Sequence, residues 1–395
     1  MTASLYIHIP FCASLCDYCD FFSVKLTDDS VLDIFIKVLL DDIKEQINLF
    51  NIDCIPTVYI GGGTPSVLGS ARMGPFLAGL QRIFASLSAS PGEFTMELNP
   101  GSADEAFLQL CRDGGINRIS MGIQSFYKKS LQAVHRECNI QLTEQRLALL
   151  AQYFPGAFSV DIIAGLPFNT LDVLKNDIER AVSFVPASLS LYSLSLDSET
   201  PLGKKVSKLG AAALSLPSGD AADELWIMGR GFLENSGYAQ YEVSNFALPG
   251  KECAHNIRYW QMENWLGAGP SASGTLIDDA SGTGMRHTYP SDIESYLSAP
   301  HPRIKTAFRE ELNRAQLIKE SILMGFRYID GPDLPLFQRR FGCNLEECIP
   351  KTIAKWNNRG FFAPAARGKL SASKSGLLFL NAFLSDAFNE LSVIE

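Results

Sequence analysis

Residues 4–22, SLYIHIPFCASLCDYCDFF, place three cysteines directly after an apolar, strand-like run. Cys12, Cys16 and Cys19 are spaced C-x3-C-x2-C, so three thiols crowd into one short loop. The chain has nine cysteines, an odd number, and the others are scattered, which does not indicate a disulfide framework. The stretch therefore predicts a loop that binds a metal centre at the end of the first strand.

Three interpretations of these thiols stay open on the residues alone. Structural cysteines, or a redox pair of Cys16 and Cys19, need no metal. A zinc site needs a fourth ligand, for which His8 is available, although zinc sites ordinarily join two separate ligand pairs. A [4Fe–4S] cluster takes cysteine thiolates, and three thiolates leave one iron open to a small molecule. We favour the cluster, because the missing fourth cysteine then has a purpose.

Strand-like and helix-length segments alternate over the first half of the chain, which is typical of a parallel sheet with crossover helices. Six strand–helix units predict an α/β fold, a partial (β/α)6 barrel rather than a complete eightfold one. The expected strands are 4–9, 57–61, 93–99, 118–124, 158–165 and 188–196, and the expected helices are 29–49, 72–87, 103–113, 127–152 and 171–184.

Polar residues stand at the ends of several expected strands. Glu97 and Asn99 end one strand, Gln124 ends the next, and Asp161 lies in the one after that. Functional side chains collect at the carboxyl ends of parallel strands. We therefore expect these residues to line one site together with the cysteine loop.

The pattern changes after residue 200. A helix is expected at 221–236 and a strand at 238–247, and the glycine-rich NWLGAGPSASG (264–274) is expected to pack closely against a site or a neighbouring backbone. Segments beyond residue 300 have helical spacing. The sequence predicts two domains, a core of residues 1–300 and a small helical, winged-helix-like domain of residues 301–395.

Composition excludes several classes of protein. The chain has 395 residues, of which 46% are hydrophobic and 19% charged, as in globular proteins. A net charge of −9 without a basic cluster argues against nucleic acid as a partner. No apolar run is long enough for a transmembrane helix, and no signal peptide is recognisable. We expect a cytoplasmic protein.

Several blocks of sequence follow one another in the order found in the radical SAM (S-adenosylmethionine) family, and the chain resembles that family. The resemblance implies a cluster on Cys12, Cys16 and Cys19, with SAM on the open iron and a cluster electron passed to SAM. The blocks are YIHIPFCASLCDYCDFF (6–22), GGGTPS (61–66), ELNP (97–100), RISMGIQSF (118–126), VDIIAGLPFNT (160–170), HNIRYW (255–260) and WLGAGPSASG (265–274).

The same resemblance implies roles for individual residues that bind the cofactors. Tyr6 would contact SAM, and Gly63 and Thr64 would lie against its methionine end. Tyr18 would shield the cluster from water. The remaining implied roles are Glu97 as an acceptor for the ammonium or ribose of SAM, Gln124 and Asp161 as partners of the ribose hydroxyls, and Arg136 as a partner for a carboxylate.

Within the family, two groups resemble this chain, the oxygen-independent coproporphyrinogen III oxidases and the haem chaperones related to them. The oxidases continue the cluster motif with a fourth cysteine, where this chain has Phe21, and carry a longer segment before the cluster strand. The chaperones carry H-N-x-x-Y-W, which matches residues 255–260. The resemblance therefore favours a haem chaperone, with an oxidase that decarboxylates tetrapyrrole propionates as the alternative.

Haem is thus a third expected cofactor, held by a segment near residues 253–275. Imidazole is a common axial ligand of haem iron, which makes His255 the expected ligand. Beyond haem, the resemblance implies haem-accepting proteins and an electron donor for the cluster as partners. A second copy of the chain, in a homodimer, is a further candidate partner. Whether SAM is cleaved in an enzymatic reaction stays open on the sequence.

Overall fold

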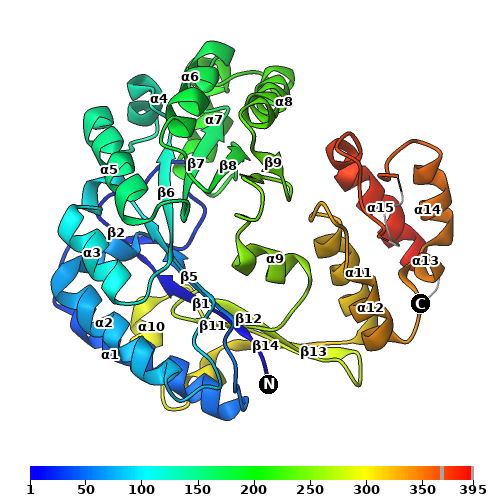
Figure 1. The fold of residues 1–395 in the computed structure, drawn as a ribbon, viewed down its shortest axis with the longest axis horizontal. Helices are drawn as coiled ribbons and strands as arrows, with labels where there is room; N and C mark the ends of the chain where they lie inside the picture. The colour runs from blue at the N-terminus through cyan, green and yellow to red at the C-terminus, as the bar shows by residue number, and fades with distance from the viewer. Residues whose placement is uncertain (365–368, 393–395) are drawn as a thin grey trace.

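The computed structural model describes residues 1–364 and 369–392, and six parallel strands form the centre of its fold. They lie side by side in chain order and curve into part of a barrel (Figure 1), which confirms the predicted α/β barrel. The strands are β1 (Ser4–Ile9), β4 (Thr57–Gly62), β5 (Glu93–Leu98), β6 (Arg118–Gln124), β7 (Phe158–Ala164) and β8 (Ser188–Ser193).

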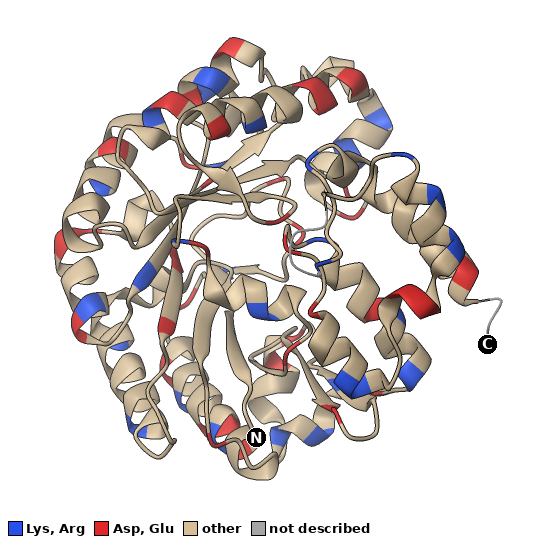
Figure 2. Ribbon diagram, turned by 45° about the vertical axis from the view of Figure 1, so that its right-hand side comes forward, with Lys and Arg blue, Asp and Glu red and all other residues tan. Residues whose placement is uncertain are grey.

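Helices cover the outer face of these strands, so the strands are apolar on both sides. In β1, only the Tyr6 side chain is more than slightly exposed. Parallel sheets carry such near-continuous apolar runs because crossover helices bury their outer face. The outer helices are α1 (Val31–Leu49), α2 (Gly69–Phe84), α3 (Glu105–Asp113), α4 (Lys128–Ala133), α5 (Ile140–Tyr153), α6 (Leu171–Val182) and α8 (Gly219–Asn235). Figure 2 shows acidic and basic positions interspersed along these helices.

The sheet extends beyond the six predicted units to twelve strands within the described residues. Strand β11 (Trp265–Ala268) pairs in parallel with β1, and β12 (Ser273–Asp278), β13 (Thr283–Thr288) and β14 (Phe308–Leu312) continue antiparallel. The glycine-rich segment packs as expected. A Cβ at Gly269, whose φ is +104°, would lie 2.3 Å from the carbonyl oxygen of His8.

Two predicted elements are wrong in detail. The helix expected over 127–152 is two helices, α4 and α5, separated by a turn in which His135 has a positive φ of 52° and Asn139 caps α5 through the backbone N–H of Leu142. The strand expected over 238–247 is two short strands, β9 (Ala239–Gln240) and β10 (Asn245–Ala247). A tight turn separates the two strands. Within this turn, the Glu242 carboxylate accepts a hydrogen bond from the Ser244 N–H at 3.1 Å.

The C-terminal region is helical, as predicted, and has its own apolar core around Phe326, Phe361 and Phe383. An antiparallel bridge joins Phe362 and Ala372. The division at residue 300 stays a prediction, and β14 extends the large sheet beyond it; residues 365–368 and 393–395 lie outside the described part. The helices are α11 (Arg314–Gly325), α12 (Leu334–Phe341), α13 (Leu345–Cys348), α14 (Pro350–Asn357) and α15 (Leu380–Leu391).

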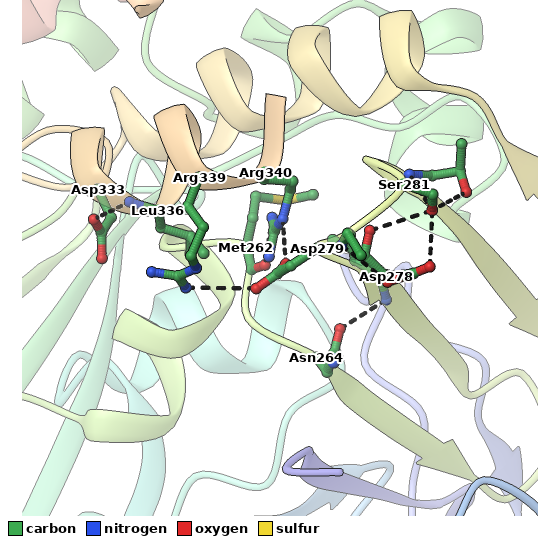
Figure 3. Close-up of polar contacts among 12 residues, drawn as sticks. Met262, Asn264, Asp278, Asp279, Ser281, Asp333, Leu336, Arg339 and Arg340 are labelled. Carbon is green, nitrogen blue, oxygen red and sulfur yellow. Dashed lines mark hydrogen bonds and ion pairs between the residues drawn. The ribbon is translucent and has the colours of Figure 1, made fainter. Parts of the chain in front are cut away.

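An ion pair ties this region to the large sheet (Figure 3). Arg340 on α12 donates through Nε to Asp279 in the β12–β13 turn at 2.7 Å, and through Nη1 to the carbonyl of Met262 at 3.1 Å. The Arg340 side chain is only 4% exposed. A buried arginine is retained where its donors are satisfied, so these contacts fix α12 against the sheet. In the described part of the chain, no helix is long and apolar enough to span a bilayer.

Candidate functional site

A cavity of about 350 Å³ opens at the carboxyl ends of the parallel strands. The cysteine loop forms one wall and the strand ends form the others, so the cavity brings together most of the residues predicted from sequence. Those that line it are Cys12, Tyr18, Gly63, Glu97, Gln124 and Asp161, together with Cys16, Cys19, Thr64 and Arg136.

Hydrogen-bond donors reach two of the three cysteine sulfurs. Thr64 donates its hydroxyl to Cys12 Sγ at 3.6 Å, and Arg136 donates through Nη1 to Cys16 Sγ at 3.5 Å. All three cysteines are free thiols. Burial raises the pKa of the Cys19 thiol to about 11, so binding of a metal centre there releases a proton. Donors aimed at sulfur stabilise thiolates, and this set fits a [4Fe–4S] cluster.

The loop is closed by its own short ladder, which sets the cysteines over the strand ends. Strand β2 (Phe11–Cys12) pairs with β3 (Val24–Lys25), and the Leu26 N–H donates to the Cys12 carbonyl at 2.8 Å. His8, the fourth ligand in the zinc interpretation, bonds Tyr6 through Nδ1 and the Phe22 carbonyl through Nε2. Both ring nitrogens of His8 are therefore already bonded, which favours a cluster over zinc.

The glycine turn after β4 lets the backbone pass close to the end of β1. Gly62 has a φ of +106°, in the region that favours glycine, and a Cβ there would lie 2.5 Å from the His8 ring. At Gly63 a Cβ would lie 2.7 Å from the Phe11 carbonyl oxygen. A side chain at Gly62 would displace the His8 ring, and one at Gly63 would displace the start of the cysteine loop, so the turn needs glycine to pass this close to both.

Glu97 lies near the end of β5 inside the cavity, and its carboxyl is buried. Its Oε1 accepts from the Tyr59 hydroxyl at 2.7 Å, and Oε2 accepts from the Gly62 N–H at 3.3 Å. Burial raises the pKa of the Glu97 carboxyl to about 7. In the empty cavity, ionising this buried carboxyl costs energy. A cationic ligand would stabilise the negative charge, so the carboxyl is well suited to bind one.

Asp161 and Gln124 line the far wall. The Asp161 carboxylate accepts from Ser190 at 2.7 Å and from Ser120 at 3.2 Å, and burial raises its pKa. Gln124 sits at a bulge with a positive φ of 67°, and its side-chain Oε1 is buried without a hydrogen-bond partner among the described residues. A buried amide oxygen without a partner is costly, so this atom indicates a missing ligand donor.

Arg136 lies in the turn between α4 and α5 and is already bonded on several sides. Besides Cys16, its guanidinium donates to the Tyr18 hydroxyl at 3.2 Å, to Asn99 Oδ1 at 3.0 Å and to the Gly122 carbonyl. It therefore joins the cysteine loop to the ends of β5 and β6. The predicted role of Arg136 is to pair with a ligand carboxylate. That pairing would require a guanidinium N–H that these contacts do not use.

Sequence reasoning missed a tie between the cysteine loop and helix α7 (Pro201–Leu209). Asp17, inside the cysteine motif, is 8% exposed and pairs through Oδ2 with Lys205 at 2.6 Å and His135 at 2.8 Å. Burial raises the pKa of Asp17, but the hydrogen bonds from Lys205 and His135 outweigh it, so the pKa lies below its usual value. An acidic residue between two cysteines of the motif is a signal in the sequence, but its partners lie far away along the chain. Tyr59, which orients Glu97, was also missed.

Two predicted residues lie outside this cavity. Tyr6 is beneath it, with its hydroxyl 2.9 Å from His8 Nδ1 and its ring stacked on Tyr59. Its contact with SAM stays a prediction. His255 is in helix α9 (Ala254–Trp260), which packs at the amino-terminal ends of the strands.

The His255 imidazole is 1% exposed and fully bonded. Its Nδ1 is 2.9 Å from the Thr57 hydroxyl and its Nε2 is 3.1 Å from the Tyr259 hydroxyl. Burial lowers the pKa of His255 to about 3, so the ring is neutral at physiological pH. Glu93 holds the start of α9 by accepting from the N–H groups of Ala254 and His255, both at 2.9 Å. Neither ring nitrogen is free for iron in this conformation.

Known proteins are similar to this chain over most of its length. The family model of the radical SAM superfamily matches residues 6–181. The heme chaperone HemW of Lactococcus lactis subsp. lactis (strain IL1403) is 32% identical, covering 90% of this chain and 89% of the relative. HemW of Escherichia coli (strain K12) is 34% identical over 69% of this chain and 70% of its own length. A mitochondrial radical S-adenosyl methionine domain-containing protein 1 of Bos taurus is 30% identical over 98% and 88%.

A solved structure has the same fold. The coproporphyrinogen III oxidase HemN from Escherichia coli, a radical SAM enzyme, superimposes with a TM-score of 0.80 at 22% identity. The match covers 98% of this chain and 89% of the oxidase. At this identity the likeness concerns the fold alone.

Proposed function

Because the chain belongs to the HemW family within the radical SAM superfamily, we propose that it is a haem chaperone, which binds haem and passes it to acceptor proteins. The observation that carries the proposal is the 32% identity to a heme chaperone over nine-tenths of this chain. We further propose that it holds a [4Fe–4S] cluster and SAM. An electron donor for the cluster and a second copy of the chain are additional proposed partners.

For the cluster, the proposed ligands are Cys12, Cys16 and Cys19. When bound, the cluster supplies one-electron chemistry. The protein's own part is to keep the thiolates in place. Thr64 and Arg136 donate to sulfur, and the tie from Asp17 to Lys205 holds the loop. Such thiols need a reducing compartment, which supports a cytoplasmic location.

For SAM, the proposed contacts follow from charge and from unsatisfied groups. Glu97 offers a carboxylate to the ammonium group, and Gln124 offers a buried amide oxygen that lacks a partner among the described residues. Gly63 and Thr64 let the backbone approach, and Asp161 is positioned for hydroxyl groups.

The oxidase alternative is tested by product analysis. Phe21, which stands where the oxidases carry a fourth cysteine, lines the cavity with 65% of its surface exposed. The assay supplies the reconstituted protein with SAM, a reductant and coproporphyrinogen III under anaerobic conditions. We expect mass spectrometry to show that the mass of the tetrapyrrole does not change. A product lacking propionate carboxyl groups would replace the chaperone proposal with the oxidase.

Binding of SAM is expected to weaken as the pH falls. The ionised Glu97 carboxylate attracts the cationic ligand, and its pKa of about 7 means that it gains a proton, and loses that attraction, as the pH drops through 7. Calorimetric titration of the reconstituted protein between pH 8 and pH 6 should show the loss. Glu97→Gln should bind weakly and equally at both pH values.

The contribution of the two cavity carboxylates to SAM binding can be measured at pH 8. Glu97→Ala and Asp161→Ala should each weaken SAM binding by about 1–3 kcal/mol, because each removes a charged hydrogen-bond partner. Glu105→Ala, an exposed carboxylate outside the cavity, is the matched control. Equal affinity in wild type and both cavity variants would show that these carboxylates do not contact SAM.

A further inference from the structure

Two cysteines of the C-terminal region lie in direct contact, outside the cavity that the cysteine loop walls (the cysteine cavity). Cys343 and Cys348 are half-buried free thiols, and their Sγ atoms are 3.5 Å apart. A disulfide bond is about 2.05 Å long, so the two sulfurs need to approach by only about 1.5 Å to be joined. Disulfides of cytosolic proteins are usually transient and serve catalysis or redox sensing. Neither thiol takes part in the proposed binding of the cluster, SAM or haem.

The chain brings these two sulfurs together across a single helical turn. Gly342, with a φ of +62°, follows the end of α12, and Cys343 lies between α12 and α13. Asn344 then caps α13 in a capping box with Glu347, whose carboxylate accepts from the Asn344 N–H at 3.1 Å. Cys348 is the last residue of α13. Because Cys343 lies between the helices, its backbone can adjust to a new bond more easily than inside a helix.

The two thiols differ in their surroundings. Arg314 donates through Nη2 to Cys343 Sγ at 3.8 Å, whereas the Cys348 thiol donates to the Asn344 carbonyl at 3.5 Å. Burial raises the pKa of the Cys348 thiol, and the neighbouring Cys343 raises it further. The thiolate is the form of cysteine that attacks a disulfide. Cys343, which has the cationic partner, is therefore the attacking sulfur, and Cys348 stays protonated until a second step.

We propose that Cys343 and Cys348 form a reversible dithiol–disulfide site that reacts with low-molecular-weight disulfides such as oxidised glutathione. The Cys343 thiolate attacks one sulfur of that disulfide, breaks its S–S bond and releases one thiolate, which leaves a mixed disulfide on Cys343. The Cys348 sulfur then attacks the Cys343 sulfur and releases the second thiolate. The protons of the two protein thiols pass to the released thiolates, so the small disulfide is reduced to two thiols while the protein dithiol is oxidised.

The new bond would restrain the link between α12 and α14. Arg340, three residues before Cys343, holds Asp279 and the carbonyl of Met262, as Figure 3 shows. The thiol pair thus follows directly after the part of α12 that is fixed to the large sheet. A bond across α13 therefore limits how far the following helices can move from that fixed point.

The test treats the anaerobically reconstituted full chain with oxidised glutathione and maps its thiols by alkylation and mass spectrometry. Trypsin releases residues 341–351 as one peptide, since an arginine precedes it and a lysine ends it. We expect this peptide to become lighter by two hydrogen atoms and to lose both alkylation sites, and dithiothreitol to restore them. Cys54, a half-buried thiol with no sulfur in contact among the described residues, is the control and should form no bond within the protein.

Single variants separate the two steps of the reaction. In Cys348→Ser, the reaction should stop at a mixed disulfide with glutathione on Cys343. In Cys343→Ser, the thiol of Cys348 should react at least about tenfold more slowly than Cys343 does in the wild type, because it lacks the cationic partner. Equal rates for the two thiols would overturn the assignment of Cys343 as the attacking sulfur.

Hydrogen exchange measures the restraint. We expect the backbone amides of α13 to exchange about tenfold more slowly in the oxidised chain, because the bond restricts the opened states of that turn. Equal exchange in both forms would overturn the restraint. Two reduced thiols after treatment, or a glutathione adduct that persists on Cys343 in the wild type, would overturn the site itself. Because the pair belongs neither to the cluster nor to the haem proposal, the proposed function would stand in each case.

Discussion

Serine at Cys12, Cys16 or Cys19 is expected to abolish the iron–sulfur cluster. A hydroxyl is a far poorer iron ligand than a thiolate, and the loop offers three thiols, so one substitution leaves two ligands for four irons. Anaerobic reconstitution of the wild type should give a brown protein with about four irons per chain. Its reduced EPR spectrum should change when SAM is added. Each variant should remain colourless.

The matched controls are Cys54→Ser and Cys343→Ser, which lie outside the cysteine cavity. Both should retain wild-type iron content. A serine variant within the motif that keeps its iron would contradict the proposed ligand set. A colourless wild type that binds one zinc ion would contradict the cluster itself.

His255→Ala is expected to lower the free energy of unfolding by about 2–4 kcal/mol. The substitution leaves a cavity in a site that is 1% exposed, and it removes the partner of the Thr57 and Tyr259 hydroxyls. Urea unfolding measures the loss. His301→Ala, whose side chain is 59% exposed, should cost well under half as much.

The same variant tests the sequence-based prediction that His255 ligates haem iron. Ligation requires Tyr259 to move away from Nε2, because that nitrogen is occupied in the structure. A shifted Soret band in His255→Ala, with the fold intact at low temperature, would support ligation. An unchanged band together with the stability loss would assign His255 to the fold alone.

Much of the barrel could be predicted because its signals are local. The six central strands are continuous apolar runs, and their polar ends meet in one place once the strands are parallel. Glu97, Gln124 and Asp161 therefore line the cavity with the cysteines. The outer strands were missed for a physical reason. Strand β13, TGMRHT, is short and only partly buried, and it is stabilised by its neighbours rather than by its own apolar pattern.

The contacts of the site depend on distant partners and were less predictable. Arg136 reaches the cysteine loop only because the expected helix over 127–152 breaks at His135. Its role as a hub for Cys16, Tyr18 and Asn99 could not be deduced from spacing. His255 is the opposite case. Its motif indicated a haem-iron ligand, whereas in the structure aromatic neighbours and Thr57 bury the imidazole.

Haem titration of the anaerobically purified protein tests the central claim most directly. We expect a new Soret band that saturates at one haem per chain and stays with the protein through gel filtration. Absorbance that rises linearly with added haem, as for free haem in buffer, and a haem-free protein after gel filtration would contradict it.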